Sequence, residues 1–512
     1  MTTSPLRARR LGPSIVAAAV LLLAAPPPDH GNGGALGALR PGSAAASRDQ
    51  WSVFDDPIRL TKRNPTTALR TLREIQALGA DTIRVAVRWA TVAPRPNSKR
   101  KPRFNSEDPS AYPGFTPFDF TIRMASSMGL RVIVTVTGDS PRWSKVGRRA
   151  QRGYVPKTRE FADFATAVAR RYSGAFAGLP KVDNFIIWNE PNWPGMLAPQ
   201  STCRRGRCSP AAAHNYRRLV RAAYPAIKRA NRDAFVMIGE LAPSGKDDMG
   251  PHRPTRPLRF LRAMACRDAR YRRIRGGPCR GFRPAMGDAI SVHPYSIYAR
   301  SISPYSGSPA RDDASIGDSR RFFATLDRLT RLGGLRVGDG RRRFSVYHTE
   351  FGTETNPPNR DRGVRFWQQA EYLNLSEEVA YRNSRIKSYA QYQLYDEGRF
   401  RDKTTWQAGL RRSRGRKKPA YYAYKFPIVV HRRRRSVVIW GRVRPGSGHR
   451  SVQLERERGS RWVRESFRVR TDRRGYFRAK RHGVAAFRFK AYSDTSSRAK
   501  LIGSSRNARP TR

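Results

Sequence analysis

The sequence predicts a closed barrel of eight parallel β-strands covered by helices, followed by a smaller all-β domain. Strand-like and helical runs alternate strictly over most of the chain, and the strands are almost continuously apolar, as strands buried on both faces are. Unusual polar residues also follow several strands at their carboxyl ends. An open doubly wound sheet would require a glycine-rich phosphate loop after the first strand, and the sequence has none there.

The predicted elements follow one another in a regular order. The eight strands are expected at 51–57, 81–94, 130–138, 182–190, 234–243, 288–296, 344–352 and 388–396. The helices between them are expected at 66–79, 118–129, 158–177, 210–231, 258–268, 322–332 and 364–381. In the first helix, apolar residues recur at helical spacing up to Gly79, a residue that suits a helix end.

The N-terminal segment has the layout of a secretory signal. Three arginines at positions 7, 9 and 10 precede an apolar run over 15–25, which is too short to span a membrane, and a stretch rich in Pro and Gly follows. We assign 1–47 to a signal peptide and flexible segment and 48–427 to the barrel. The mature protein is expected to be secreted or associated with the cell surface, with no membrane span.

The C-terminal part changes composition after position 427. Short runs with period-two alternation are separated by Gly, Asp and Ser, which is typical of a small β-sandwich. We therefore assign 428–503 to an accessory β-domain and 504–512 to a basic tail. Trp440, Trp462 and Tyr476 suit either a carbohydrate-binding surface or the core of this domain.

The four cysteines form two local pairs in the sequence. Cys203 and Cys208 lie close together, as do Cys266 and Cys279. In an exported chain an even number of cysteines indicates disulfides. A metal site is the alternative, but no histidine-rich cluster accompanies either pair and the spacing is not that of a zinc ribbon, so we expect no metal.

The net charge of +62 raises the question of an anionic partner. Clustered arginines neutralise the phosphates of nucleic acid, but here the arginines are scattered and no nucleic-acid-binding module is recognisable. We expect no nucleic acid. An acidic polysaccharide, an anionic cell surface or biased codon composition explains the charge more simply. We expect a monomer.

The stretch FIIWNEPNW, 185–193, carries the first candidate for catalysis. A buried strand ends here at Glu190, because Pro191 cannot continue a central strand. Partly apolar surroundings raise the pKa of a carboxyl group, as a proton donor near neutral pH requires, and aromatic faces such as that of Trp193 pack against sugar rings. The alternative is a strand end followed by an ordinary turn.

A second stretch of the same form favours catalysis over a turn. FSVYHTEFG, 344–352, is again a β-branched and aromatic run that ends on a carboxylate, Glu350. Two carboxylates at the carboxyl ends of barrel strands are what glycoside hydrolysis requires.

These motifs resemble a known group of enzymes. WNEPN, HPY at 293–295 and TEFG at 349–352 are similar to the clan of retaining glycoside hydrolases with (β/α)8 barrels. TVTGDSPRW, IGELAP and YQLYD are most similar to family thirty-nine and its bacterial relatives, the β-xylosidases and exopolysaccharide-cleaving endoglycosidases. The resemblance covers roughly 51–427. It is specific for clan and mechanism and much less so for the substrate.

The resemblance implies roles for individual residues. Glu190 would be the general acid/base and Glu350 the nucleophile. Asn189 would hydrogen-bond the sugar 2-hydroxyl, an interaction that strengthens in the transition state.

Three further residues match supporting positions of the clan. Arg84 would keep the nucleophile ionised, and His293 and Tyr295 would shape its surroundings. The alternative for Arg84 is one more arginine in an arginine-rich chain. For His293 and Tyr295 it is packing in the core or in a turn.

The sugar subsite is less well defined by the sequence. Many clan members end strand eight with a tryptophan that floors this subsite, whereas this strand reads AQYQLYDEG. Tyr392, Tyr395 or Trp406 can take that place. Trp143, in the loop after the third strand, is another candidate for substrate contact, as is Trp193.

The sequence therefore predicts a secreted, retaining glycosidase that cleaves a poly- or oligosaccharide without metal or other cofactor. The alternative function is a catalytically silent polysaccharide-binding barrel at the cell surface, with both acids present but the subsites remodelled.

Overall fold

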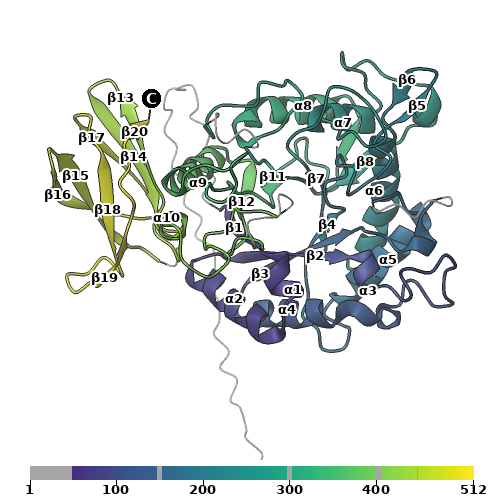
Figure 1. The fold of residues 1–512 in the computed structure, drawn as a ribbon, viewed down its shortest axis with the longest axis horizontal. Coiled ribbons are helices and arrows are strands. Elements are labelled where there is room, and N and C mark those ends of the chain that lie inside the picture. The colour runs from purple at the N-terminus through teal and green to yellow at the C-terminus, as the bar shows by residue number, and fades with distance from the viewer. Residues whose placement is uncertain (1–48, 147–152, 297–302, 399–404, 447, 512) are drawn as a thin grey trace, which may run out of the picture. The chain divides into compact units, whose positions relative to one another are not determined.

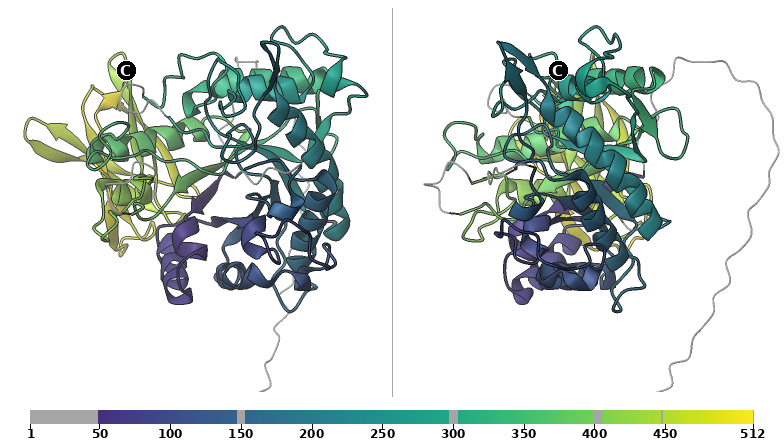
Figure 2. Two further views of the ribbon diagram at one scale, coloured as in Figure 1. Left: turned by 45° about the vertical axis from the view of Figure 1, so that its right-hand side comes forward. Right: turned by 90° about the vertical axis from the view of Figure 1, so that its right-hand side faces the viewer.

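The computed structural model describes residues 49–146, 153–296, 303–398, 405–446 and 448–511, so the predicted signal segment lies outside the described residues. Eight strands form a closed barrel in the order β1-β12-β11-β9-β7-β4-β3-β2, and every neighbouring pair is parallel (Figure 1). Helices surround the barrel strands (Figure 2). Among the described helices, none is long and apolar enough to cross a membrane.

The bounds of the barrel elements agree with the predicted alternation. The strands are β1 Trp51–Asp55, β2 Thr82–Arg88, β3 Arg131–Thr137, β4 Asn184–Ile187, β7 Phe235–Leu241, β9 Ala289–Val292, β11 Val346–His348 and β12 Ile386–Tyr392. The α-helices are α1 Pro57–Thr61, α2 Pro65–Ala77, α3 Trp89–Val92, α4 Thr116–Ser127, α5 Thr158–Arg171, α6 Ala211–Ala230, α7 Pro257–Met264, α8 Ser319–Arg331, α9 Phe366–Tyr381 and α10 Pro419–Lys425. Two short pairs, β5 Thr202–Arg204 with β6 Arg207–Ser209 and β8 Ala285–Gly287 with β10 Leu335–Val337, lie outside the barrel. The 3₁₀ helices are η1 Pro109–Ala111, η2 Pro113–Phe115, η3 Arg142–Ser144, η4 Gly277–Cys279 and η5 Ile316–Asp318.

Several strands end earlier than the sequence predicts. Strand β2 ends at Arg88, and α3 takes up the next four residues. Strand β4 ends at Ile187, because the backbone leaves the extended region at Trp188 and Glu190, whose φ angles are 71° and 41°. Asn189 and Glu190 therefore lie in the loop just beyond the strand, at the mouth of the barrel.

An apolar layer fills the barrel interior beneath this mouth. It consists of the inward-facing side chains Val53, Ile133, Ile186, Met237, Ala289, Tyr347 and Ala390. Inward positions further along the strands are polar, as at Asp55, two residues after Val53, and Thr135, two residues after Ile133. The change from apolar to polar positions gives the barrel a packed floor and a polar mouth.

The C-terminal part consists of two four-stranded sheets, β17-β14-β13-β20 and β16-β15-β18-β19. Their strands are β13 Ile428–Arg433, β14 Ser436–Arg442, β15 Ser451–Arg458, β16 Arg461–Arg470, β17 Tyr476–His482, β18 Phe487–Tyr492, β19 Leu501–Ser504 and β20 Pro510–Thr511. Both sheets contribute to one apolar core, as the sandwich-like prediction requires. The structure differs at the end of the chain: β20 pairs with β13 inside the segment assigned to a basic tail.

Buried polar contacts join the barrel to these sheets. Glu377 of α9 accepts hydrogen bonds from Arg444 at 2.5 and 3.0 Å and from Arg442 at 3.3 Å. Arg442 also donates to the hydroxyl of Ser52 in β1. Separating the partners of a buried ion pair leaves an uncompensated charge, which is costly. Moving the sheets away from α9 would carry this cost, so these contacts hold the sheets against α9.

The aromatic residues considered for carbohydrate binding in this part are largely buried. Trp440 and Tyr476 pack against α9 residues, including Tyr381, in a separate apolar cluster. Trp462 lies beneath the guanidinium of Arg488. Packing therefore accounts for Trp440 and Tyr476.

Candidate active site

The predicted site residues converge from five different strands or the loops that follow them. Arg84 projects from β2, Asn189 and Glu190 follow β4, His293 and Tyr295 follow β9, Glu350 follows β11, and Tyr392 ends β12. Buried Asp55 and Glu240, at the carboxyl ends of β1 and β7, join them. The carboxyl ends of parallel strands meet at one end of a barrel, and this is why residues so distant in sequence come together.

Arg84 is the centre of a polar network and is 2% exposed. One terminal nitrogen donates to Glu350 Oε1 at 2.7 Å and to the Asp55 carboxylate. The other donates to Asn189 Oδ1 at 2.6 Å and to Glu240 Oε2 at 2.5 Å, while Nε donates to Glu240 Oε1 at 2.6 Å. One guanidinium therefore positions Asn189 and Glu350 together, with Glu240 fixing its plane through a bidentate contact.

The carboxylates of Glu190 and Glu350 face each other across His293. One oxygen of each lies within 4.8 Å of the other. His293 Nδ1 lies 3.0 Å from Glu190 Oε1 and 3.5 Å from Glu350 Oε2. The hydroxyl of Tyr295 donates to Glu350 Oε2 at 3.0 Å. Glu350 therefore has contacts from Arg84 on one oxygen and from Tyr295 on the other.

The surroundings of Glu190 favour its protonated form. Burial raises the pKa of this carboxyl group, and the carboxylate of Glu350 raises it further, while His293 and Arg84 lower it. The net pKa of Glu190 is above its usual value. A proton is therefore held at Glu190 to higher pH than on an exposed glutamate, as a general acid requires.

Two neighbouring groups have opposite shifts. Burial alone would lower the pKa of His293, but Glu350, Glu190 and Glu240 raise it to about 10. Burial alone would raise the pKa of Glu240, but Arg84 and His293 lower it to about 2. At neutral pH His293 is thus an imidazolium that donates to Glu190, and Glu240 is a carboxylate that balances the positive charges.

An aromatic group lies beside Glu350. The ring of Tyr295 lies 5.1 Å from that of Trp406, and both lie near the ring of Tyr392, at 6.4 and 6.1 Å. The hydroxyl of Tyr392 points to Glu397 at 3.4 Å. Trp406, which follows β12, therefore belongs to the aromatic group beside Glu350.

The two other tryptophans considered for substrate contact lie elsewhere. Trp143 is 4% exposed, packs edge-on against Trp89 and donates from Nε1 to the carbonyl of Pro94. No described contact joins it to either carboxylate. Trp193 is 41% exposed, and its backbone N–H donates to the carbonyl of Glu190. Core packing thus accounts for Trp143, whereas Trp193 remains available at the rim.

Asp55 and Glu240 belong to the network, although no role for either was predicted from the sequence. The signal was present in each case: WSVFDDP ends in two acids and IGELAP contains one acid at the end of an apolar run. A sequence pattern does not give the distance from these two carboxylates to Arg84. Their contacts with Arg84 are what make them parts of the site.

The cysteines pair as predicted, in disulfides Cys203–Cys208 and Cys266–Cys279, so their sulfurs are not available as metal ligands. Glu190, His293 and Glu350 have the spacing of a three-ligand metal site. In the structure these atoms contact one another and, for Glu350, also Arg84 and Tyr295.

Comparison with known proteins defines the class to which the chain belongs. Residues 52–257 match the model of the family described as cellulase (glycosyl hydrolase family 5), and this segment holds Arg84, Asn189, Glu190 and Glu240. Together with the closed parallel barrel, the match identifies a glycosidase. No curated protein matches the sequence.

Several solved structures resemble the chain at low identity. A family 39 glycoside hydrolase from Bacteroides cellulosilyticus has 15% identity and a TM-score of 0.47, with 86% of this chain and 82% of that chain covered. A monomeric β-xylosidase from Caulobacter crescentus has the same identity and TM-score, with 86% and 96% covered. A family 5 enzyme from Streptomyces cattleya has 16% identity and a TM-score of 0.44, with 73% and 78% covered.

Replacing His293 with asparagine should move the alkaline limb of the activity profile to higher pH. The imidazolium lowers the pKa of Glu190, so its loss leaves burial and the Glu350 carboxylate to raise that pKa further, with Arg84 as the remaining cation. Activity that depends on protonated Glu190 would then persist to higher pH. The measurement is kcat/KM against pH on one aryl glycoside. A limb that stays in place or moves to lower pH would contradict the contact between His293 and the acid.

Proposed function

We propose that the protein is an exported retaining glycosidase, acting as a monomer on O-glycosidic bonds of a poly- or oligosaccharide. In the first step Glu190 protonates the leaving oxygen while Glu350 attacks the anomeric carbon and forms a glycosyl-enzyme. In the second step Glu190, now a carboxylate, takes a proton from water as that water displaces Glu350 from the sugar. Export is in keeping with the two disulfides.

The observation that carries this proposal is the separation of the two carboxylates. Retaining enzymes hold their two carboxyl groups about 5 to 5.5 Å apart, whereas inverting enzymes need about 6.5 to 9.5 Å to admit a water molecule between base and sugar. An oxygen of Glu190 within 4.8 Å of one of Glu350 supports the shorter spacing.

The remaining contacts support the same assignment of roles. Arg84 and Tyr295 each donate to Glu350, so its two oxygens are held in place for attack on the sugar. Arg84 fixes Asn189 through its oxygen, and the amide nitrogen, which has no hydrogen-bond partner among the described residues, can donate toward a sugar hydroxyl. A catalytically silent binding barrel would not require this arrangement around both acids.

The stereochemistry of the product tests the proposal. A panel of aryl glycosides and oligosaccharides would first identify a cleaved substrate, and proton NMR would then follow the anomeric signals during hydrolysis. We expect the first-formed sugar to have the same anomeric configuration as the substrate. An inverted first product would rule out the double displacement, and no cleavage across the panel would favour the binding barrel.

A further inference from the structure

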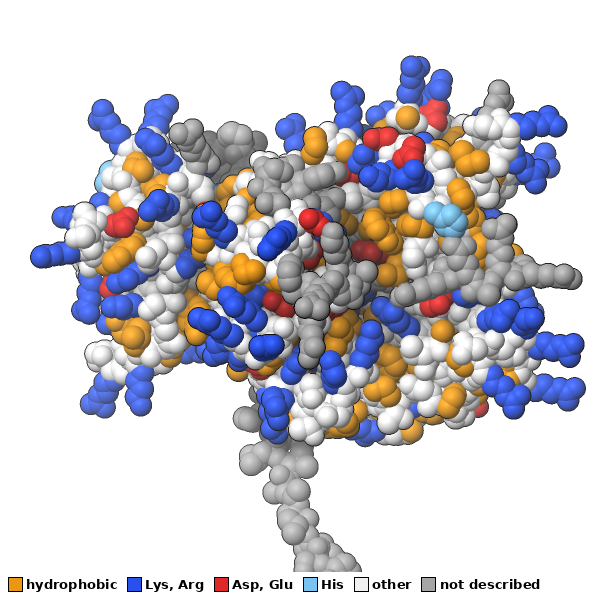
Figure 3. All heavy atoms as spheres, viewed as in Figure 1, with side chains coloured by type: hydrophobic (Ala, Val, Ile, Leu, Met, Phe, Trp, Pro, Cys, Tyr) orange, Lys and Arg blue, Asp and Glu red, His pale blue; other side chains and the backbone are white. Residues whose placement is uncertain are grey.

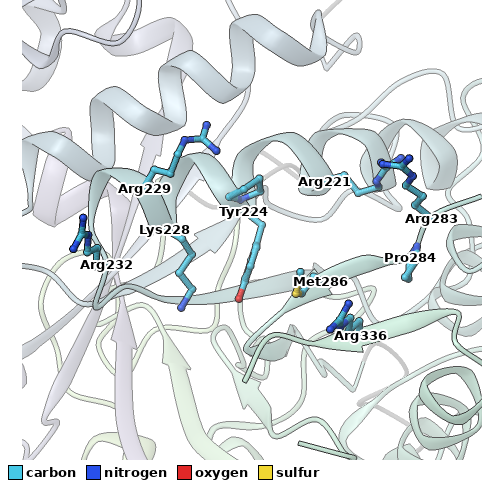
Figure 4. Close-up of a pocket in the computed structure, with 10 residues that line it drawn as sticks. Arg221, Tyr224, Lys228, Arg229, Arg232, Arg283, Pro284, Met286 and Arg336 are labelled. Carbon is cyan, nitrogen blue, oxygen red and sulfur yellow. The ribbon is translucent and has the colours of Figure 1, made fainter. Parts of the chain in front are cut away.

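A second cavity, far from the catalytic carboxylates, is surrounded by positive charge. It has a volume of about 870 Å³ and lies outside the barrel, between α6 and the strand pair β8 and β10 (Figure 4). Its apolar lining is Tyr224, Pro225, Pro284 and Met286. Six cationic side chains line it as well: Arg221, Lys228, Arg229, Arg232, Arg283 and Arg336.

Part of this charge lies along one side of α6. Arg221, Pro225 and Lys228 are spaced by four and three residues, which places them on one helical face, and Arg232 lies just beyond the end of the helix. In the view of Figure 4, Arg221 and Arg283 lie to one side of Tyr224, and Lys228 and Arg232 lie to the other. The lining of the cavity thus combines cationic with apolar side chains.

Most of this charge has no ion-pair partner within the described part of the chain. Lys228 pairs with Asp288 at 2.7 Å, and Asp288 also accepts from the Tyr224 hydroxyl. Among the described residues, no carboxylate forms an ion pair with Arg221, Arg229, Arg232, Arg283 or Arg336. Five guanidinium groups around one cavity repel one another, and a bound anion would relieve that repulsion.

Another cavity of the protein has a different balance of charge. It has a volume of about 520 Å³ and is also rich in arginine, but acids accompany them. Arg256 pairs with Asp247 and Asp313, and Arg262 pairs with Asp312. Figure 3 shows blue Lys and Arg side chains spread over the whole visible face, so the cavity is distinguished by the grouping of its cations around one hollow and not by unpaired charge alone.

The cavity lies toward the opposite end of the barrel from the active site. Arg232 comes three residues before β7, whereas Glu240 lies at the carboxyl end of that strand. Seven residues of strand rise by roughly 20 Å. A ligand in this cavity therefore does not occupy the catalytic subsites.

We propose that this cavity is a secondary binding site for an anionic carbohydrate polymer, which holds the enzyme on its substrate. That the ligand is a carbohydrate rests on the proposed function. That it is anionic rests on the arginines around the cavity that have no ion-pair partner among the described residues. Acidic groups of the polymer contact the guanidinium groups, and sugar faces pack on the apolar side chains between them.

The test removes charge from the cavity and, separately, the same charge from another surface. One variant carries Arg221→Gln, Arg283→Gln and Arg336→Gln, and the control carries Arg461→Gln, Arg464→Gln and Arg470→Gln on β16. All six arginines are exposed. Binding of the full-length protein to polygalacturonate, dextran sulfate and neutral dextran is measured at several salt concentrations.

We expect the cavity variant to bind at least one of the two acidic polymers roughly tenfold more weakly than the unmodified protein. Its binding should also depend less on salt. The control variant should lose less than half as much affinity. The acidic polymer that shows the larger loss identifies carboxylate or sulfate as the preferred group. An equal loss in both variants would overturn the proposal, because diffuse charge would then suffice. Unchanged binding in the cavity variant would also overturn it.

Two further ligands and one activity assay distinguish an acidic polysaccharide from nucleic acid, from a lipid surface and from the catalytic substrate. A larger loss of binding to duplex DNA, or to phosphatidylglycerol vesicles, than to acidic polysaccharide would overturn the proposal in favour of those partners. Hydrolysis of a small neutral aryl glycoside should be the same in the cavity variant and the unmodified protein. If the unmodified protein cleaved no glycoside but the cavity variant still lost polymer binding, the proposed function would fail while the binding site stood.

Discussion

Replacing Glu350 with alanine should reduce turnover by roughly 10⁴-fold or more, even on substrates with very good leaving groups. Without this carboxylate no glycosyl-enzyme can form, and a better leaving group does not supply the missing nucleophile. The measurement is the initial rate on an activated aryl glycoside, with the protein concentration high enough to detect residual activity.

A matched control and a rescue experiment make this result specific. Glu160→Gln removes one negative charge on the outer helix α5, where Glu160 pairs with Lys101, and should leave the rate within about twofold of the unmodified enzyme. Added azide can occupy the space of the missing carboxylate in Glu350→Ala and attack the sugar directly. The product should then be a glycosyl azide of inverted configuration. Near-normal turnover of Glu350→Ala without azide would rule out its role as nucleophile.

The barrel was predictable because its strands are apolar on both faces and alternate with amphipathic helices. That pattern depends only on burial, so it survives in a single sequence. Strand ends were less predictable, since they depend on individual backbone angles. The apolar run into Trp188 looks like continued strand, but Trp188 adopts a positive φ and ends β4 earlier.

The C-terminal sheets show a second limit. Strand β13 contains two arginines of a run that looks unsuited to a strand, and β20 has only two paired residues. Both depend on partners elsewhere in the sheet. The accessory β-domain was predicted from its clearest alternating runs, whereas edge pairing requires the three-dimensional arrangement.

The site residues that belong to a recognisable sequence motif were predictable. Those that join the site only because they lie close to it in space were not. Glu190 and Glu350 each end a recognisable strand, and the clan resemblance adds Arg84 and His293. Asp55 and Glu240 join them only through the guanidinium of Arg84. Trp143 illustrates the reverse case, since its place after a barrel strand suggested substrate contact but its ring is buried against Trp89.

Replacing Glu190 with alanine should have a different effect from the loss of Glu350, and the difference assigns the two roles. General acid catalysis contributes about 10²- to 10⁴-fold, so hydrolysis of a natural glycoside should fall by at least that factor. A leaving group that needs no proton should still depart, so the glycosyl-enzyme should form from an activated aryl glycoside. The reaction should then stall, because no base is present to activate water. A burst of released phenol followed by a slow steady state would report this stall.

Azide should release the stalled intermediate of Glu190→Ala, because it attacks without a general base. It displaces Glu350 from the sugar, and two successive inversions give a glycosyl azide with the configuration of the substrate. The same nucleophile would therefore yield opposite anomers from the two alanine variants, retained from Glu190→Ala and inverted from Glu350→Ala. The anomeric proton signals of the two products distinguish them in one NMR experiment. An inverted azide from Glu190→Ala, or the same anomer from both variants, would require the roles of acid/base and nucleophile to be reassigned.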